Sequence, residues 1–204
     1  MQSAADKSKG SGAMSDQVAG VPDVETLIAE ISELRGKVAQ LQDRVEQLDQ
    51  LAHQDTLIDL PNRRGFMRAL ERLIDRVRRY GEQGALLFVD LDGLKFINDS
   101  FGHAAGDQAL IQVARLLSGG VRRSDLVARL GGDEFGILLV HSDEANAHDT
   151  AARLVDLIAG SEFSHAGQAL PLSVAIGVGM IGGEDSAETV MARADAEMYR
   201  RKAA

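Results

Sequence analysis

Apolar residues recur at alternating spacings of three and four residues between positions 24 and 52. Valine or isoleucine fills the first apolar position of each heptad and leucine the second, up to a final alanine: Val24, Leu27, Ile31, Leu34, Val38, Leu41, Val45, Leu48 and Ala52. This combination favours two parallel helices. We therefore predict a parallel dimeric coiled coil over residues 23–54, which makes a homodimer through Val24–Ala52. The alternative is a single amphipathic helix lying on its own domain, and the narrowness of the stripe favours the coiled coil.

The pattern downstream switches between helical and strand spacing, and Leu60-Pro61-Asn62 marks the predicted end of the long helix. Apolar residues at helical spacing from Phe66 to Tyr80 predict a second helix. The remaining predicted elements are a strand at 85–91, a helix at 104–117, strands at 125–130 and 135–140, a helix at 144–158, a strand at 170–180 and a helix at 187–201. The core order β-α-β-β-α-β predicts an α+β, ferredoxin-like fold, which is an antiparallel sheet with helices on one face. In that fold the first strand and the hairpin lie side by side.

Composition narrows the class of protein. The chain has 204 residues, 45% of them hydrophobic, which suits one domain plus an extension. Its formal net charge of −9 argues against nucleic acid as a partner, and no apolar stretch reaches membrane-spanning length, so we expect no membrane association. The lack of cysteine fits a cytoplasmic protein. Residues 1–22 predict a disordered leader, derived in part from an expression vector upstream of Met14.

Two predicted strand ends carry carboxylates. Gly131-Gly132 supplies the positive φ that a tight hairpin requires and holds Asp133 and Glu134 at its tip. The strand at 85–91 runs into a second acidic pair, Asp90-x-Asp92. If the two strands are neighbours, Asp90 and Asp133 converge in an oxygen-only pocket of the kind that Mg²⁺ prefers. A solvated acidic turn is the alternative for either end alone.

A polar loop is predicted to lead from Asp92 into the next helix, and it carries Lys95, Asn98, Asp99, Gly102, His103, Gly106 and Asp107. Together with Gly131-Gly132-Asp133-Glu134-Phe135, this spacing resembles the GGDEF domain of diguanylate cyclases. The resemblance extends to the entry segment Asp55–Arg64 and to Arg193-Ala194-Asp195 near the exit, and it covers residues 53–202. It implies a nucleotidyl-cyclase-like palm at 55–204 that condenses two GTP into cyclic di-GMP and two pyrophosphates.

The resemblance also implies the cofactor and its ligands. Two Mg²⁺ ions per half-site, with Mn²⁺ as an alternative ion, would be held by Asp90, the backbone carbonyl of Leu91 and Asp133, with Glu134 as a further ligand. The implied catalytic carboxylates are Asp133 and Glu134, of which Asp133 would assist deprotonation of the attacking hydroxyl. Because a symmetric product is most simply made by two half-sites that face each other, the resemblance agrees with a homodimer.

Guanine would be read by Asn98 and Asp107, because a carboxylate can accept from the N1 and N2 hydrogens that adenine lacks. The remaining implied substrate contacts are Asp99, His103 and, toward phosphate, Lys95 and Lys202. Simpler alternatives exist: Asp107 is also a favourable carboxylate at a helix N-terminus, Asn98 a turn residue, and each lysine a solvated charge.

Arg122-x-x-Asp125 resembles the family's inhibitory site for cyclic di-GMP, with Arg153 as a further arginine. Its placement before the hairpin favours product feedback over chance. The alternative function is a catalytically weak or inactive cyclic di-GMP receptor that signals through its coiled coil, on which an upstream sensor or partner protein would act.

The sequence departs from the family pattern at two places. Gly93-Leu94 stands where the family commonly has a larger side chain and phenylalanine. The Gly-Arg-Asn turn and closing strand of the family do not follow Lys202, so we expect a shortened domain with weakened catalysis.

Overall fold

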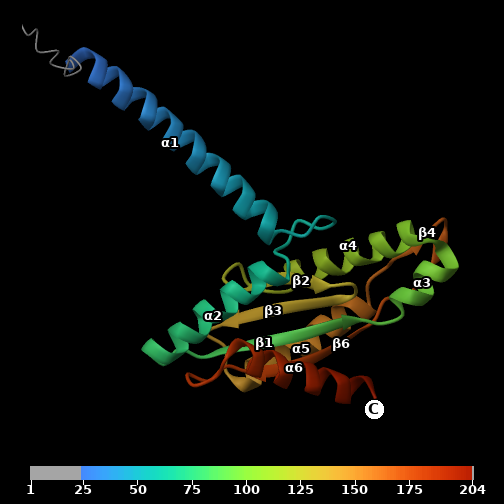
Figure 1. Cartoon of the computed structure of the whole chain (residues 1–204). Helices are drawn as coiled ribbons and strands as arrows, with labels where there is room; N and C mark the ends of the chain where they lie inside the picture. The colour runs from blue at the N-terminus through green and yellow to red at the C-terminus, as the bar shows by residue number, and fades with distance from the viewer. Residues whose placement is uncertain (1–23, 204) are drawn as a thin grey trace, which may run out of the picture. The chain divides into compact units, whose positions relative to one another are not determined.

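The computed structural model describes residues 24–203, apart from the side chains at 26, 43 and 46–52 (Figure 1). The predicted leader, residues 1–22, lies outside the described residues. The chain divides into two compact units, one up to Glu46 and one from Gln47 onward. Among the described helices, none combines the length and the apolar character needed to cross a membrane.

Helix α1 spans Val24–His53 without interruption, in agreement with the heptad pattern. The apolar side chains of its stripe that the structure describes are exposed: Val24, Leu27, Ile31, Leu34, Val38, Leu41 and Val45. A continuous exposed apolar stripe is typical of a helix that packs against a partner. The parallel dimer stays a prediction.

The second unit is built on a four-stranded antiparallel sheet in the order β2-β3-β1-β6. Its strands are β1 (Gly84–Leu91), β2 (Leu126–Gly131), β3 (Glu134–Val140) and β6 (Val174–Met180). The first strand and the hairpin are neighbours, as predicted, and β1 is central. Every residue of β1 is buried except the half-buried Asp90, because both faces of the sheet are covered.

Helices cover both faces of this sheet, as Figure 1 shows. They are α2 (Arg63–Tyr80), α4 (His103–Gly119), α5 (Glu144–Ala159) and α6 (Ala187–Lys202). The helices of the predicted core, α4 and α5, pack on the face presented by Leu87 and Val89. Helices α2 and α6 pack on the opposite face with Leu86 and Phe88. The prediction that helices cover one face of the sheet is therefore correct only for α4 and α5, the helices of the ferredoxin-like core.

Residues 94–101, predicted as loop, form helix α3 (Leu94–Phe101). The buried side chains of Leu94 and Ile97 hold this helix on the same core as α4. A small hairpin, β4 (Ser164–His165) and β5 (Gln168–Ala169), also lies outside the predicted elements. The predicted strand 170–180 begins only at Val174, and the irregular residues before it include Pro171, which has no N–H to donate to a ladder.

The long helix ends earlier than predicted, at His53 rather than near Leu60. The chain then makes an isolated antiparallel bridge between Gln54 and Pro61. Asn62 caps α2 by accepting hydrogen bonds from the backbone N–H groups of Arg64 (2.9 Å) and Gly65 (3.1 Å). The segment between the two helices is thereby fixed at both ends.

Strand β6 is an edge strand of the sheet, and side chains of α6 bond to its outer backbone groups. The Glu197 carboxylate accepts from the N–H of Val178 at 3.0 Å. The guanidinium of Arg193 donates to the carbonyl of Met180 at 2.5 Å. Helix α6 therefore provides hydrogen-bond partners for two backbone groups on the open edge of the sheet.

Candidate active site

The acidic ends of β1 and β3 meet in register. Asp90 lies directly opposite Glu134, and the N–H of the next residue, Leu91, donates to the carbonyl of Asp133 at 2.9 Å. Because side chains alternate along a strand, Asp90 lies on the same face as Phe88, toward α2 and α6. The predicted pairing of the first strand with the hairpin is confirmed, and the cross-strand partner of Asp90 is Glu134; convergence of Asp90 with Asp133 stays a prediction.

The turn that carries Asp133 differs in detail from the prediction. Of the two glycines in the hairpin, Gly131 and Gly132, only Gly132 has a positive φ, +35°. The pairing of β2 with β3 shifts register between Arg129 and Gly131. The turn residues are Gly132 and Asp133, whereas Glu134 is the first residue of β3. One carboxylate therefore lies at the tip of the hairpin and the other on the sheet.

Lys202, at the end of α6, forms ion pairs with both carboxylates of the Asp90-x-Asp92 segment. Its Nζ pairs with Oδ1 of Asp90 and lies 3.4 Å from Oδ1 of Asp92. The hydrogen bond to Asp90 raises the pKa of Lys202, so its ammonium stays charged. Asp92 also accepts a hydrogen bond from the Ser173 hydroxyl at 2.9 Å. The lysine that the sequence indicates for phosphate is thus held by carboxylates here.

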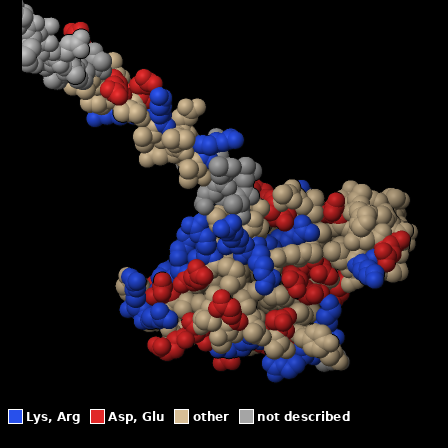
Figure 2. Space-filling view, in the orientation of Figure 1, with Lys and Arg blue, Asp and Glu red and all other residues tan. Residues whose placement is uncertain are grey.

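Glu134 lies in an electrostatically mixed setting. Burial raises its pKa; Arg63 opposes the rise, while the carboxylates of Asp133, Asp90 and Asp195 add to it. Glu134, Arg63 and Asp195 line one cavity of about 240 Å³. Figure 2 shows basic side chains gathered over α2, whose arginines are all exposed. A positive surface therefore begins beside the acidic strand ends.

The carboxylate oxygens of Asp90 and Glu134 are ligands of the kind that a hard cation such as Mg²⁺ prefers. Asp90 already holds one cation, the Lys202 ammonium, and faces the carboxylate-bearing Glu134. In the described part of the chain, no three His, Cys, Asp or Glu side chains converge closely enough to hold a metal ion by themselves. Backbone or substrate oxygens would therefore have to complete a coordination shell, as they commonly do for Mg²⁺.

The predicted guanine-reading residues, Asn98 and Asp107, lie on α3 and α4, which contact each other. Asn98 lies over Gly106, where an added Cβ would come within 2.0 Å of the Asn98 Oδ1 atom. Asp107 follows Gly106 on α4 and is exposed. Gly102, between the helices, has φ +84°, and its N–H donates to the Asn98 carbonyl at 2.9 Å. Close helix packing thus holds Asn98 against α4 at the residue before Asp107, and it requires glycine at 106.

The other candidates on these two helices are exposed: Lys95, Asp99 and His103. No side-chain contact of theirs directs them toward the acidic strand ends among the hydrogen bonds of the described residues. Their substrate roles stay predictions.

At the predicted inhibitory site, two of the three residues are held by the protein itself. The Asp125 carboxylate accepts from the backbone N–H groups of Arg122 (2.9 Å) and Val140 (3.2 Å). The Arg153 guanidinium donates to the carbonyl of Gly120 at 2.7 Å. The Arg122 side chain is exposed. Asp125 thus fixes the turn from which Arg122 projects.

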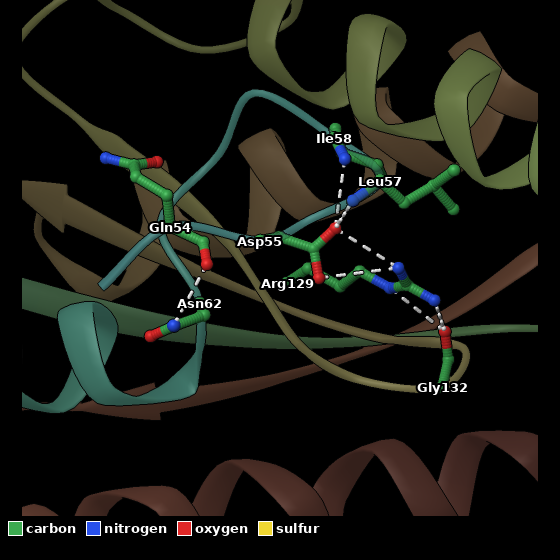
Figure 3. Close-up of polar contacts among 7 residues, drawn as sticks. All are labelled: Gln54, Asp55, Leu57, Ile58, Asn62, Arg129 and Gly132. Carbon is green, nitrogen blue, oxygen red and sulfur yellow. Dashed lines mark hydrogen bonds and ion pairs between the residues drawn. The ribbon is translucent and has the colours of Figure 1, made fainter. Parts of the chain in front are cut away.

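Arg129 is a site residue that the sequence did not single out (Figure 3). Its Nε and Nη2 groups donate to the Gly132 carbonyl at 3.2 and 2.9 Å, and Nη1 pairs with the Asp55 carboxylate at 3.2 Å. Asp55 in turn accepts from the N–H groups of Leu57 and Ile58 at 2.9 and 3.0 Å. The hairpin tip is therefore tied to the segment that follows α1. The motif beginning at Asp55 was the available signal, but its partner lies 74 residues away.

The fold and the paired acidic strand ends agree with one family. Residues 52–204 match the family described as "Diguanylate cyclase, GGDEF domain". The chain therefore belongs to the GGDEF-domain family of diguanylate cyclases.

Curated relatives are longer than this chain. It is 39% identical over 183 residues to diguanylate cyclase TpbB of Pseudomonas aeruginosa. The aligned region covers 87% of this chain and 41% of TpbB. It is 37% identical over 157 residues to the response regulator PleD of Caulobacter vibrioides. This aligned region covers 76% of this chain and 35% of PleD. The chain thus spans less than half the length of either relative.

Solved structures share the fold. The crystal structure of the coiled coil and GGDEF domain of DgcB from Caulobacter crescentus, in complex with c-di-GMP, has a TM-score of 0.78 at 25% identity. That match covers 87% of this chain and 95% of the DgcB chain. The GGDEF domain of TpbB gives a TM-score of 0.67 at 37% identity and covers 71% of this chain and 92% of that domain.

Proposed function

We propose that this chain is the catalytic part of a diguanylate cyclase. Two GTP molecules would react reciprocally: the 3′-oxygen of each attacks the α-phosphorus of the other, two phosphodiester bonds form, and two pyrophosphates leave. The observation that carries the proposal is the register of β1 with β3, which sets Asp90 opposite Glu134 beside the turn bearing Asp133. Family membership gives this acidic pair its chemical meaning.

The chain's own groups would divide the work. Asp90, the Leu91 carbonyl, Asp133 and Glu134 would hold two divalent ions, Mg²⁺ or Mn²⁺. When bound, such ions neutralise triphosphate charge and acidify a coordinated hydroxyl. Asp133 would accept the 3′-hydroxyl proton, since the hairpin turn places it outside the sheet where a facing nucleotide can reach it. Lys95 and Lys202 would meet phosphate oxygens.

Guanine selection would rest on Asn98 and Asp107. The α3–α4 contact through Gly106 holds the two residues on adjacent helices, which supports a shared base site. A site whose polar groups hydrogen-bond the edge of the correct base binds a base without the matching donors far more weakly. Asp99 and His103 would contact the same nucleotide.

Dimerisation and feedback belong to the same proposal. The exposed apolar stripe of α1 supports a parallel dimer that brings two half-sites together. The exposed Arg122 beside the fixed Asp125 supports a product site, to which Arg153, now bonded to the Gly120 carbonyl, would contribute a further guanidinium. DgcB, with c-di-GMP in its crystal structure, is a relative in which the product binds.

The test is product formation by the purified chain with GTP and Mg²⁺, followed by chromatography. We expect cyclic di-GMP from GTP and no cyclic product from ATP. Asp90→Asn and Asp133→Asn should each slow the reaction about 100-fold or more, as removal of a key electrostatic group commonly does. Asp149→Asn, an exposed change of equal charge on α5, is the matched control. Absence of product from the wild type, or equal rates for all three variants, would overturn the proposal.

A further inference from the structure

One ammonium group bridges the two carboxylates at the end of β1. Lys202 Nζ pairs with Asp90 and with Asp92, and the Asp90 side chain is only 15% exposed, against 39% for Lys202. Asp92 is further fixed by the Ser173 hydroxyl. The last turn of α6 therefore delivers a positive charge onto a partly buried acidic pair.

The contact is specific to one of three basic residues in that turn. Arg201 is engaged with the Glu197 carboxylate at 2.8 Å and lies 3.2 Å from His148 Nδ1. Arg200 donates to the carbonyl of Ala196 at 3.3 Å, within the helix. Only Lys202 of these three reaches Asp90, so a general excess of positive charge at the helix end does not account for the pairing.

A lysine ammonium and a divalent ion compete for the same oxygen. Lys has three donors and no acceptor, so every lone pair it takes from Asp90 is lost to a metal ion. A second cation on that carboxylate would also lie within a few ångströms of the ammonium, where like charges repel strongly in a partly buried site. Occupation by one therefore disfavours occupation by the other.

We propose that Lys202 is an internal competitor for the cation position at Asp90. Without a divalent ion it neutralises Asp90 and Asp92, and ion binding displaces it. The last turn of α6 is thereby coupled to occupancy of the site, and the released ammonium becomes available to phosphate. This inference rests on the proposed metal-dependent function and goes beyond it, because it assigns Lys202 a role before any nucleotide arrives.

The test measures metal binding without nucleotide, so that turnover plays no part. Mn²⁺ is titrated into the purified chain, and free Mn²⁺ is followed by electron paramagnetic resonance. Lys202→Met should lower the Kd for Mn²⁺ by about fivefold, the scale of a partly exposed ion pair near 1 kcal/mol. Lys202→Arg should bind like the wild type, since it keeps the charge. Arg200→Met removes one positive charge from the same turn and is the matched control, expected to change the Kd less than twofold.

A second readout follows the lysine itself. Diamagnetic Mg²⁺ should shift the NMR signal of the Lys202 side chain in the wild type, and Asp90→Asn should abolish the shift. Two results would overturn the inference. If Mn²⁺ binding depends on Asp90 but Lys202→Met behaves like Arg200→Met, the competitor role fails while the metal site stands. If neither the wild type nor Lys202→Met binds Mn²⁺ in an Asp90-dependent way without nucleotide, the inference fails, because Lys202 then has no ion to compete with; the proposed cyclase function, in which substrate oxygens can complete the shell, is tested separately by product formation from GTP.

Discussion

Arg129 donates two hydrogen bonds to the backbone carbonyl of Gly132, the residue that precedes Asp133 at the hairpin tip. The same guanidinium pairs with Asp55, and both side chains are largely buried, at 15% and 17% exposure. A carbonyl held by two donors fixes the turn more firmly than a hairpin ladder does alone. The orientation of Asp133 thus depends on a contact with the segment just after α1.

Removing the guanidinium should therefore reduce both stability and activity. We expect Arg129→Ala to lower the free energy of unfolding by about 1 to 3 kcal/mol, because it removes the charge partner of the largely buried Asp55 carboxylate, which keeps its two backbone donors, and both side-chain donors to the Gly132 carbonyl. Denaturant unfolding measures the first effect and cyclic di-GMP formation the second. In a double-mutant cycle with Asp55→Asn, the two losses should not add. Simple additivity would show that the two side chains act independently.

The contact between α3 and α4 predicts a defect in nucleotide binding. Gly106→Ala places a methyl group against the Asn98 side chain, which must move away. We expect weaker GTP binding and a loss of about 1 to 3 kcal/mol of stability from overpacking. Gly119→Ala on the same helix is the control, since a Cβ there meets no atom within 4 Å. Isothermal titration calorimetry with GTP measures the affinity of each variant. Equal GTP affinities for Gly106→Ala and Gly119→Ala would contradict the role given to Asn98.

Glu134 predicts how stability depends on pH. Its pKa is raised above 4.5, chiefly by burial, so the folded chain retains a proton that the unfolded chain has already lost. Stability must then fall as the pH rises from about 4.5 through the raised pKa. Glu134→Gln removes this penalty, and its Tm relative to the wild type should be higher at pH 7 than at pH 4. Melting curves in the presence of chelator test this, and a Tm difference independent of pH would refute it.

Asp185 predicts the opposite dependence. Its pKa is lowered from 3.8, chiefly by the hydrogen bond from Arg193, with a further contribution from the Gly182 N–H. The stabilisation is present above the ordinary pKa and is lost as the pH falls through the lowered one. Asp185→Asn should cost about 1 kcal/mol at pH 7 and less near pH 3. Thermal unfolding at the two pH values distinguishes this from an unchanging loss, which would point to packing.

The apolar stripe of α1 predicts that assembly and activity are linked. Leu34→Asp places a charge on an exposed stripe position and should convert a dimer to a monomer, with loss of cyclic di-GMP formation. Gln40→Asp, away from the stripe, adds the same charge and should change neither. Sedimentation velocity and product formation are compared for both variants. Full activity in a monomeric Leu34→Asp variant would remove the coiled coil from the mechanism.

The sequence predicted most of what local pattern determines. The apolar run of β1, the hairpin and the long heptad helix each follow from the spacing of their own residues. Helix α3 was missed because its polar residues, such as Asn98 and Asp99, resemble those of a loop, whereas tertiary burial of Leu94 and Ile97 stabilises the helix. Residues 170–173 were assigned to a strand because Leu170 and Leu172 continue the apolar pattern; both are buried, but Pro171 has no N–H to donate to a ladder.

The finer features of the site depend on register and on distant partners. A single-residue difference in pairing decides whether Glu134 or Asp133 faces Asp90, and no sequence pattern fixes that choice. The Arg129–Asp55 and Lys202–Asp90 pairs join residues 74 and 112 positions apart. One sequence alone gives no sign of such pairings, because the local pattern around each residue does not identify its distant partner.

The side chains that α6 places against β6 have a consequence for solubility. An uncovered outermost strand is a template on which another chain can add its own backbone, and such growth leads to fibres. With the Val178 N–H bonded to Glu197 and the Met180 carbonyl bonded to Arg193, an incoming strand finds these positions already taken. Helix α6 thereby limits self-association through the β6 edge of the sheet.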